Sequence, residues 1–152
     1  MSANVVETAQ EAFLLVAEDN PADVGLIRLA LKEHGVQTGV RIVSDGEAAV
    51  HFIDMVEADP AAACPALAIL DLNLPRVSGG EILRRLRVST KWRDVPVIVV
   101  SSSLSPRDRK DAIQLGASAY FAKPSDLEEF LRLGALISKI LADQALLETP
   151  KS

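Results

Sequence analysis

Five side chains that could act together on a substrate each follow a short apolar stretch of the chain. They are Glu18, Asp19, Asp71, Ser101 and Lys123. Carboxylates without histidine or cysteine beside them are hard oxygen ligands, which suit Mg²⁺ or Mn²⁺. A carboxylate next to such a cation can attack phosphorus, while Lys123 and the Ser101 hydroxyl would bind the phosphoryl oxygens. The set therefore predicts metal-assisted phosphoryl transfer.

Asp71 is the expected phosphoryl acceptor, because it follows the apolar stretch that would lie at the centre of a sheet. We expect Asp19 and Asp71 to bind the cation directly and Glu18 to bind it through water. The backbone carbonyl of Asn73 can supply a further oxygen. Three neighbouring carboxylates repel one another, so one of them should stay protonated until a cation binds.

The elements that must position these side chains alternate strictly along the chain. Short apolar runs predict strands and amphipathic segments predict helices. The predicted strands are 13–17, 40–43, 66–70, 96–100 and 119–122, and the helices follow N-cap signals at Asn20, Asp45, Ser78, Ser105 and Ser125, the last as a capping box with Glu128. Such alternation implies a parallel sheet with right-handed crossovers and helices on both faces. Ligands bind at the carboxyl edge of such sheets, where the five side chains fall.

Composition limits the classes of protein to consider. The 152 residues suit one domain, with 49% hydrophobic and 24% charged residues. We expect a single domain over 1–152, with a core at about 12–142, a tail at 1–11, and an extended last helix and tail at 125–152. The net charge of −5 argues against nucleic acid as a partner. A membrane span and a signal peptide are not expected, which predicts a cytoplasmic protein.

These motifs resemble the receiver domains of bacterial two-component response regulators. The matching segments are 14–20 (LLVAEDN), 69–75 (ILDLNLP), 96–101 (PVIVVS) and 116–124 (GASAYFAKP). The resemblance implies a flavodoxin-like doubly wound (βα)5 fold, with a five-stranded parallel sheet in the order 2-1-3-4-5. It also implies a phosphoacceptor signalling domain, not an enzyme, with at most self-phosphorylation and slow autodephosphorylation.

The resemblance implies a mechanism as well. A histidine kinase would donate its phosphoryl group to Asp71 in a Mg²⁺-dependent reaction. Ser101 would then move towards the phosphoryl group and Tyr120 would turn inward. The surface of the fourth helix, fifth strand and fifth helix would change its partner preference. Lys123 and Pro124 would be joined by a cis peptide bond, which proline tolerates.

A narrower likeness concerns the small regulators that serve bacterial phytochromes. Residues 18–23 (EDNPAD), residues 45–48 (DGEA) and the insert before the third strand carry it. It implies a phytochrome-type sensor kinase as partner. The alternatives are a phosphate sink or intermediate receiver in a multistep relay, a pseudo-receiver, and a phosphohydrolase of the haloacid dehalogenase type. The last class carries a second Asp where this chain has Asn73.

The last predicted helix has two apolar stripes. Leu127, Phe130, Leu131, Ile137 and Leu141 would face the sheet. The second stripe consists of Leu133, Leu136, Ile140 and Leu147, with spacings typical of a coiled-coil seam. A helix that is apolar on two faces usually buries both, which predicts a homodimer or docking to a kinase; the alternative is a tail that folds back over its own domain.

Two further features of the chain are assigned structural roles. The basic run of Arg84, Arg85 and Arg87 is expected on a solvated helix face. Trp92 is expected to anchor a loop.

Overall fold

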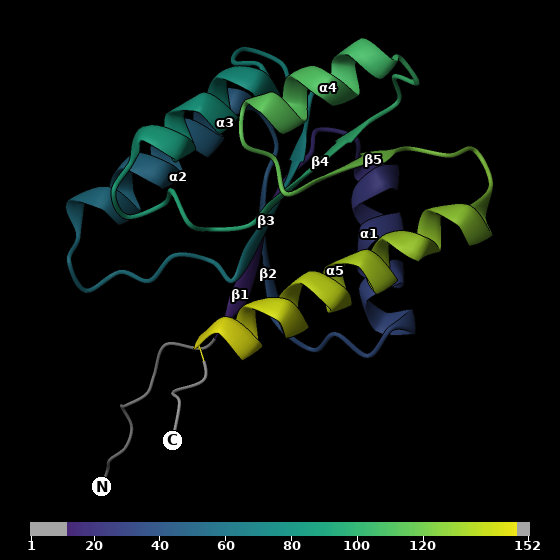
Figure 1. Cartoon of the computed structure of the whole chain (residues 1–152), viewed down its shortest axis with the longest axis horizontal. Coiled ribbons are helices and arrows are strands. Elements are labelled where there is room, and N and C mark those ends of the chain that lie inside the picture. The colour runs from purple at the N-terminus through teal and green to yellow at the C-terminus, as the bar shows by residue number, and fades with distance from the viewer. Residues whose placement is uncertain (1–11, 149–152) are drawn as a thin grey trace, which may run out of the picture.

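The computed structural model describes residues 12–148, with side chains described through residue 145. Strands and helices alternate throughout this range, as the sequence predicted (Figure 1). The strands are β1 (Phe13–Ala17), β2 (Gly39–Val43), β3 (Leu67–Asp71), β4 (Val97–Ser101) and β5 (Ala119–Ala122). The helices are α1 (Pro21–Glu33), α2 (Gly46–Ala58), α3 (Gly79–Val88), α4 (Pro106–Gln114) and α5 (Leu127–Glu148). None of these helices is both long and apolar enough to cross a bilayer.

All strand pairs are parallel, and their order across the sheet is β2-β1-β3-β4-β5, which confirms the predicted fold. In the register, Val16 lies between Ile42 and Ile69. The direction in which strands are added reverses between β1 and β3. Their carboxyl ends therefore flank the switch point, where a doubly wound sheet binds its ligand.

The sheet is buried on both faces, which explains why its central strands are continuous apolar runs. Helices α1 and α5 cover one face, and α2, α3 and α4 cover the other (Figure 1). Successive residues of a strand point to opposite faces, so Leu14 and Val16 pack towards α1 and α5 while Leu15 and Ala17 pack towards the other three helices. Trp92 is fully buried in the latter cluster, which confirms that it anchors its loop.

Most helices begin at the predicted caps. Asn20, Asp45, Ser78 and Ser105 each accept a backbone N–H from the first turn that follows. The cap predicted for α5 is one residue too early. That helix begins at Leu127, and Oδ1 of Asp126 accepts the N–H of Glu128 at 3.1 Å. Asp126 thus takes the capping role assigned to Ser125, because it stands at the residue before the first helical one.

The predicted cis peptide bond before Pro124 is wrong, since no cis bond occurs among residues 12–148. The trans form of such a bond is lower in free energy by about 0.5–1 kcal/mol. The N–H of Lys123 donates to the carbonyl of Ser101 at 2.7 Å, which extends the β4–β5 pairing by one residue. This pairing fixes Lys123 at the sheet edge while the bond to Pro124 is trans.

The predicted partner stripe on α5 is wrong for Leu133, whose exposed fraction is 0%. Leu133 packs with Phe130 and Ile137 in the core between α5, α1 and the sheet. Leu136 and Ile140 are half-buried against the same core, and the side chain of Leu147 lies outside the described residues.

Leu127, predicted to face the sheet, is instead 50% exposed. Close packing at Gly134 explains the orientation of α5. A Cβ at Gly134 would overlap the carbonyl oxygen of Ala30 in α1, so glycine allows the two helices to approach on this side.

Candidate functional site

Three carboxylates meet at the carboxyl ends of β1 and β3. Glu18 and Asp19 directly follow β1, Asp71 ends β3, and one oxygen of each lies within 4.8 Å of the others. Glu18 and Asp71 are buried, whereas Asp19 is exposed and opens the cluster to solvent. The structure therefore brings together the three side chains predicted as metal ligands. The set consists of hard oxygen donors, which fits Mg²⁺ or Mn²⁺.

The carboxyl of Glu18 has a raised pKa in this cluster. Burial and, after it, the adjacent Asp71 raise the pKa of its carboxyl to about 7, although contacts with Lys123 and the Asn20 N–H lower it in part. Its Oε1 is buried and has no hydrogen-bond partner among the described residues, although it lies 3.0 Å from Nζ of Lys123. A buried acceptor of this kind fits a cation ligand, directly or through water. One carboxyl holding a proton near neutrality is what the sequence predicted.

Both carboxylate oxygens of Asp71 have partners. Oδ1 accepts the backbone N–H of Asn73 at 2.9 Å, and Oδ2 accepts from Nζ of Lys123 at 3.2 Å. The N–H of Asn73 thus helps to orient the Asp71 carboxylate, while the metal-binding role of the Asn73 carbonyl stays a prediction. Helix α3 packs closely against the backbone of Asp71, as Gly79 at its start shows: a Cβ there would lie 2.5 Å from the Asp71 carbonyl oxygen. Asp71 is therefore held by its own loop, by α3 and by the end of β5.

Lys123 is the cation of the site, and its side chain is 13% exposed. Burial lowers the pKa of its ammonium, but contacts with the carboxylates of Asp23, Glu18 and Asp71 outweigh that effect and leave the pKa above its usual value. Lys123 is therefore charged at neutral pH. It lies where it could contact a phosphoryl group on Asp71.

Ser101 and Tyr120 are joined through the loop between β4 and α4. Ser101 is fully buried at the end of β4, and its Oγ accepts the N–H of Ser103 at 3.0 Å. The hydroxyl of Tyr120 donates to the carbonyl of Ser103 at 2.9 Å, and the Tyr120 ring is buried. The Ser103 hydroxyl in turn donates to Asp108 at 2.6 Å, at the start of α4. A displacement of Ser101 can thus be transmitted to α4 and β5 through Ser103, which contacts Asp108 and Tyr120.

Two residues that sequence reasoning missed make specific contacts. Asp23 in the first turn of α1 accepts from Nζ of Lys123 at 2.8 Å. The sequence placed it in the segment 18–23 (EDNPAD) but gave no indication that it contacts Lys123. Arg87, predicted on a solvated face, is half-buried and donates to the backbone carbonyls of Gly116, Arg93 and Val95.

The other two arginines of that basic run behave differently. Arg85 pairs with Asp54 and Glu57 of α2. Arg84 is exposed, as the sequence predicted. Nothing in the spacing of the run distinguishes its three arginines.

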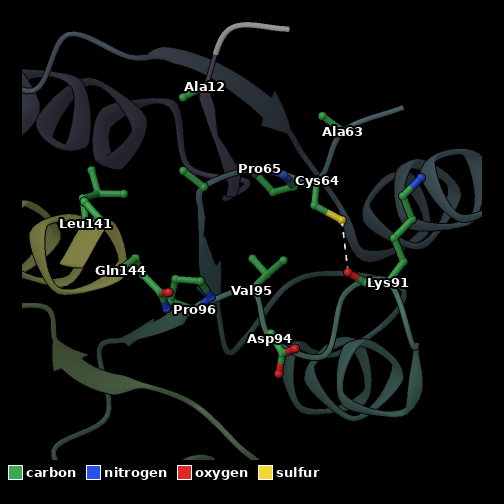
Figure 2. Close-up of a pocket in the computed structure, with 12 residues that line it drawn as sticks. Ala12, Ala63, Cys64, Pro65, Lys91, Asp94, Val95, Pro96, Leu141 and Gln144 are labelled. Atoms are coloured by element: carbon green, nitrogen blue, oxygen red, sulfur yellow. Dashed lines mark hydrogen bonds between the residues drawn. The ribbon is translucent and has the colours of Figure 1, made fainter. Parts of the chain in front are cut away.

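A hollow at the opposite edge of the sheet is separate from this site. It measures about 480 Å³, and its lining includes Cys64, Pro65, Pro96 and Gln144 (Figure 2). The Cys64 thiol lies 3.4 Å from the carbonyl oxygen of Lys91, and burial raises the pKa of this thiol. Cys64 is therefore a protonated thiol in a structural contact, and a reactive thiolate is not favoured there.

The chain matches known proteins over most of its length. The response regulator receiver domain family matches residues 14–133. A probable methanogenesis regulatory protein, FilR2 of Methanothrix harundinacea, is 31% identical over 131 residues, which are 86% of this chain and 84% of FilR2. Response regulator Rcp1 of Synechocystis sp. is 28% identical over 120 residues, which are 79% of this chain and 82% of Rcp1.

Solved structures agree with these matches. The crystal structure of the phosphorylated cyanobacterial phytochrome response regulator RcpA has a TM-score of 0.76 at 28% identity, covering 89% of this chain and 96% of RcpA. The crystal structure of a Mn²⁺-bound form of Rcp1 has a TM-score of 0.72 at 26% identity, covering 92% of this chain and 97% of that one. With its sheet order, its acidic cluster and this family match, the chain belongs to the response regulator receiver domains of two-component systems, close to the phytochrome response regulators.

Proposed function

We propose that this protein accepts a phosphoryl group from a histidine kinase on Asp71, with Mg²⁺ or Mn²⁺ held by Glu18, Asp19 and Asp71. The observation that carries the proposal is the convergence of three acidic side chains and Lys123 at one point of the sheet edge. A bound divalent cation would neutralise the carboxylates and the charge of the incoming phosphoryl oxygens.

The residues of the chain do the remaining work of the transfer. A carboxylate oxygen of Asp71 attacks phosphorus, a P–O bond forms, and the P–N bond of the kinase phosphohistidine breaks with its electron pair left on the imidazole nitrogen. Lys123 neutralises one phosphoryl oxygen, and the Ser101 hydroxyl donates to another. The N–H of Asn73 keeps the Asp71 carboxylate oriented.

The role is that of a phosphoacceptor in signalling, with at most self-phosphorylation and slow autodephosphorylation. A phosphohydrolase of the haloacid dehalogenase type would need a second acid two residues after the acceptor. That position holds Asn73, whose N–H is bonded to Asp71. Phosphorylation would act through Ser101, Ser103 and Tyr120 on the surface of α4, β5 and α5, which would change partner binding. Tyr120 is already buried in this structure.

The partner we propose is a phytochrome-type sensor kinase, supported by the likeness to RcpA and Rcp1. A phosphate sink or an intermediate receiver in a multistep relay remains the alternative. Self-association through the α5 residues Leu136 and Ile140 stays a prediction.

The test is incubation with acetyl phosphate and Mg²⁺, followed by intact-protein mass spectrometry. We expect one added phosphoryl group on the unaltered protein. No adduct should form when the metal is chelated before acetyl phosphate is added, or in Asp71→Asn. The matched control is Asp45→Asn, an N-cap carboxylate of α2 outside the acidic cluster. It should still be phosphorylated. An adduct that persists in Asp71→Asn would refute the proposal.

A further inference from the structure

Asp23 accepts a shorter hydrogen bond from the Lys123 ammonium than Asp71 does, although it is not among the residues that define the site. Nζ of Lys123 donates to Oδ2 of Asp23 at 2.8 Å and to Oδ2 of Asp71 at 3.2 Å. Asp23 lies 100 residues before Lys123, and its side chain is only 19% exposed. The contact joins the first turn of α1 to the end of β5, directly beside the acceptor.

The carboxylate partners of Lys123 would respond differently to a divalent cation. Glu18 and Asp71 belong to the cluster whose oxygens lie within 4.8 Å of one another, and Asp23 does not. A cation neutralises the charge of its own ligands, so it weakens their attraction for an ammonium group. The attraction between Lys123 and Asp23 is retained in that state.

We propose that Asp23 is a positioning residue, which holds the Lys123 ammonium next to Asp71 while the cation is bound. This inference rests on the phosphoacceptor function proposed above. A free lysine side chain has many rotamers. Fixing it in one of them costs conformational entropy, and this cost opposes its binding of the phosphoryl oxygens. The charged hydrogen bond to Asp23 fixes Lys123 before the phosphoryl group arrives, so this ordering does not have to occur during transfer.

The first measurement uses the protein at saturating Mg²⁺ without a phosphodonor, so it does not depend on phosphorylation. An N-hydroxysuccinimide acetate reagent acetylates lysine amines, and peptide mass spectrometry gives the rate at Lys123. Asp23→Asn should raise this rate about fivefold or more, because the ammonium loses the one carboxylate partner that the cation does not neutralise. Glu128→Gln removes an exposed first-turn carboxylate of α5 and should leave the rate unchanged. Equal rates at Lys123 in Asp23→Asn and the unaltered protein would overturn the proposal.

The second measurement is the rate of phosphorylation by acetyl phosphate at saturating Mg²⁺. Asp23→Asn should slow it about tenfold, and Asp23→Glu, which keeps the charge, should restore part of the loss. In a Lys123→Met background, Asp23→Asn should have no further effect, because it acts through Lys123.

Two outcomes of this second measurement would count against the inference in different ways. A further loss in the Lys123→Met background would overturn the positioning role. Failure of the unaltered protein to become phosphorylated would refute the proposed function instead. It would also remove the purpose assigned to Asp23, whatever the acetylation rates.

Discussion

The guanidinium group of Arg87 donates to three backbone carbonyls, which lie in two loops, 93–95 and 116. Nε and Nη2 donate to the Gly116 carbonyl at 3.0 and 2.8 Å, and Nη1 donates to the carbonyls of Arg93 and Val95 at 2.9 Å each. The backbone at Gly116 has φ +109°, and a Cβ there would lie 2.8 Å from Nε of Arg87. Burial lowers the pKa of this guanidinium, which nevertheless stays charged at neutral pH.

Replacing Arg87 with Met removes all four hydrogen bonds and leaves three carbonyls without this donor. Hydrogen bonds to a charged group contribute about 1.5–3 kcal/mol each when buried. Because Arg87 is half-exposed and water can replace part of the loss, we count about 1 kcal/mol for each carbonyl. The expected decrease in the free energy of unfolding is therefore about 3 kcal/mol. With a urea m-value of about 2 kcal/mol per molar, the midpoint should fall by about 1.5 M.

Trp92 is the only tryptophan and is fully buried, so its fluorescence can follow unfolding in urea. Arg84→Met is the matched control, since Arg84 is exposed on the same helix and should not change the midpoint measurably. Arg87→Lys should recover only part of the loss, because one ammonium cannot reach three carbonyls. An Arg87→Met midpoint equal to that of the unaltered protein would refute the reasoning, as would an equal loss in Arg84→Met.

Three further outcomes are expected. Gly79→Ala should slow phosphorylation of Asp71 about tenfold or more, because the new methyl group would lie 2.5 Å from the Asp71 carbonyl oxygen. The rate is followed by intact-protein mass spectrometry, and an unchanged rate would count against this packing. Mg²⁺ affinity, measured by calorimetry, should fall up to about tenfold per pH unit below pH 7, where Glu18 holds a proton that the cation must displace. It should level off above pH 7, and equal affinities at pH 6 and pH 8 would contradict the role of Glu18. Gly134→Val should lower the free energy of unfolding by about 1–3 kcal/mol, and the thermal midpoint by several degrees, because the new side chain would overlap the Ala30 carbonyl. A midpoint equal to that of the unaltered protein would refute the close approach of α1 and α5.

The strands and the members of the acidic cluster were predictable because the necessary information is local. A strand buried on both faces has to be an apolar run, and a polar residue at its end marks the sheet edge. Glu18, Asp19, Asp71 and Lys123 could therefore be grouped before their distances were known. The resemblance to receiver domains supplied the strand order, which the structure confirms.

The orientation of α5 and the partners of individual charged residues were decided only by tertiary structure. Helical periodicity predicts that apolar residues share a face, but the position of α1 decides which face is buried, and Gly134 places Leu133 there.

Arg84 and Arg87 are equivalent in the sequence, yet only Arg87 reaches carbonyls from residues 93, 95 and 116. Asp23 likewise meets Lys123 across 100 residues. Such contacts depend on distances between elements, which the packing of the whole chain sets and no local pattern contains.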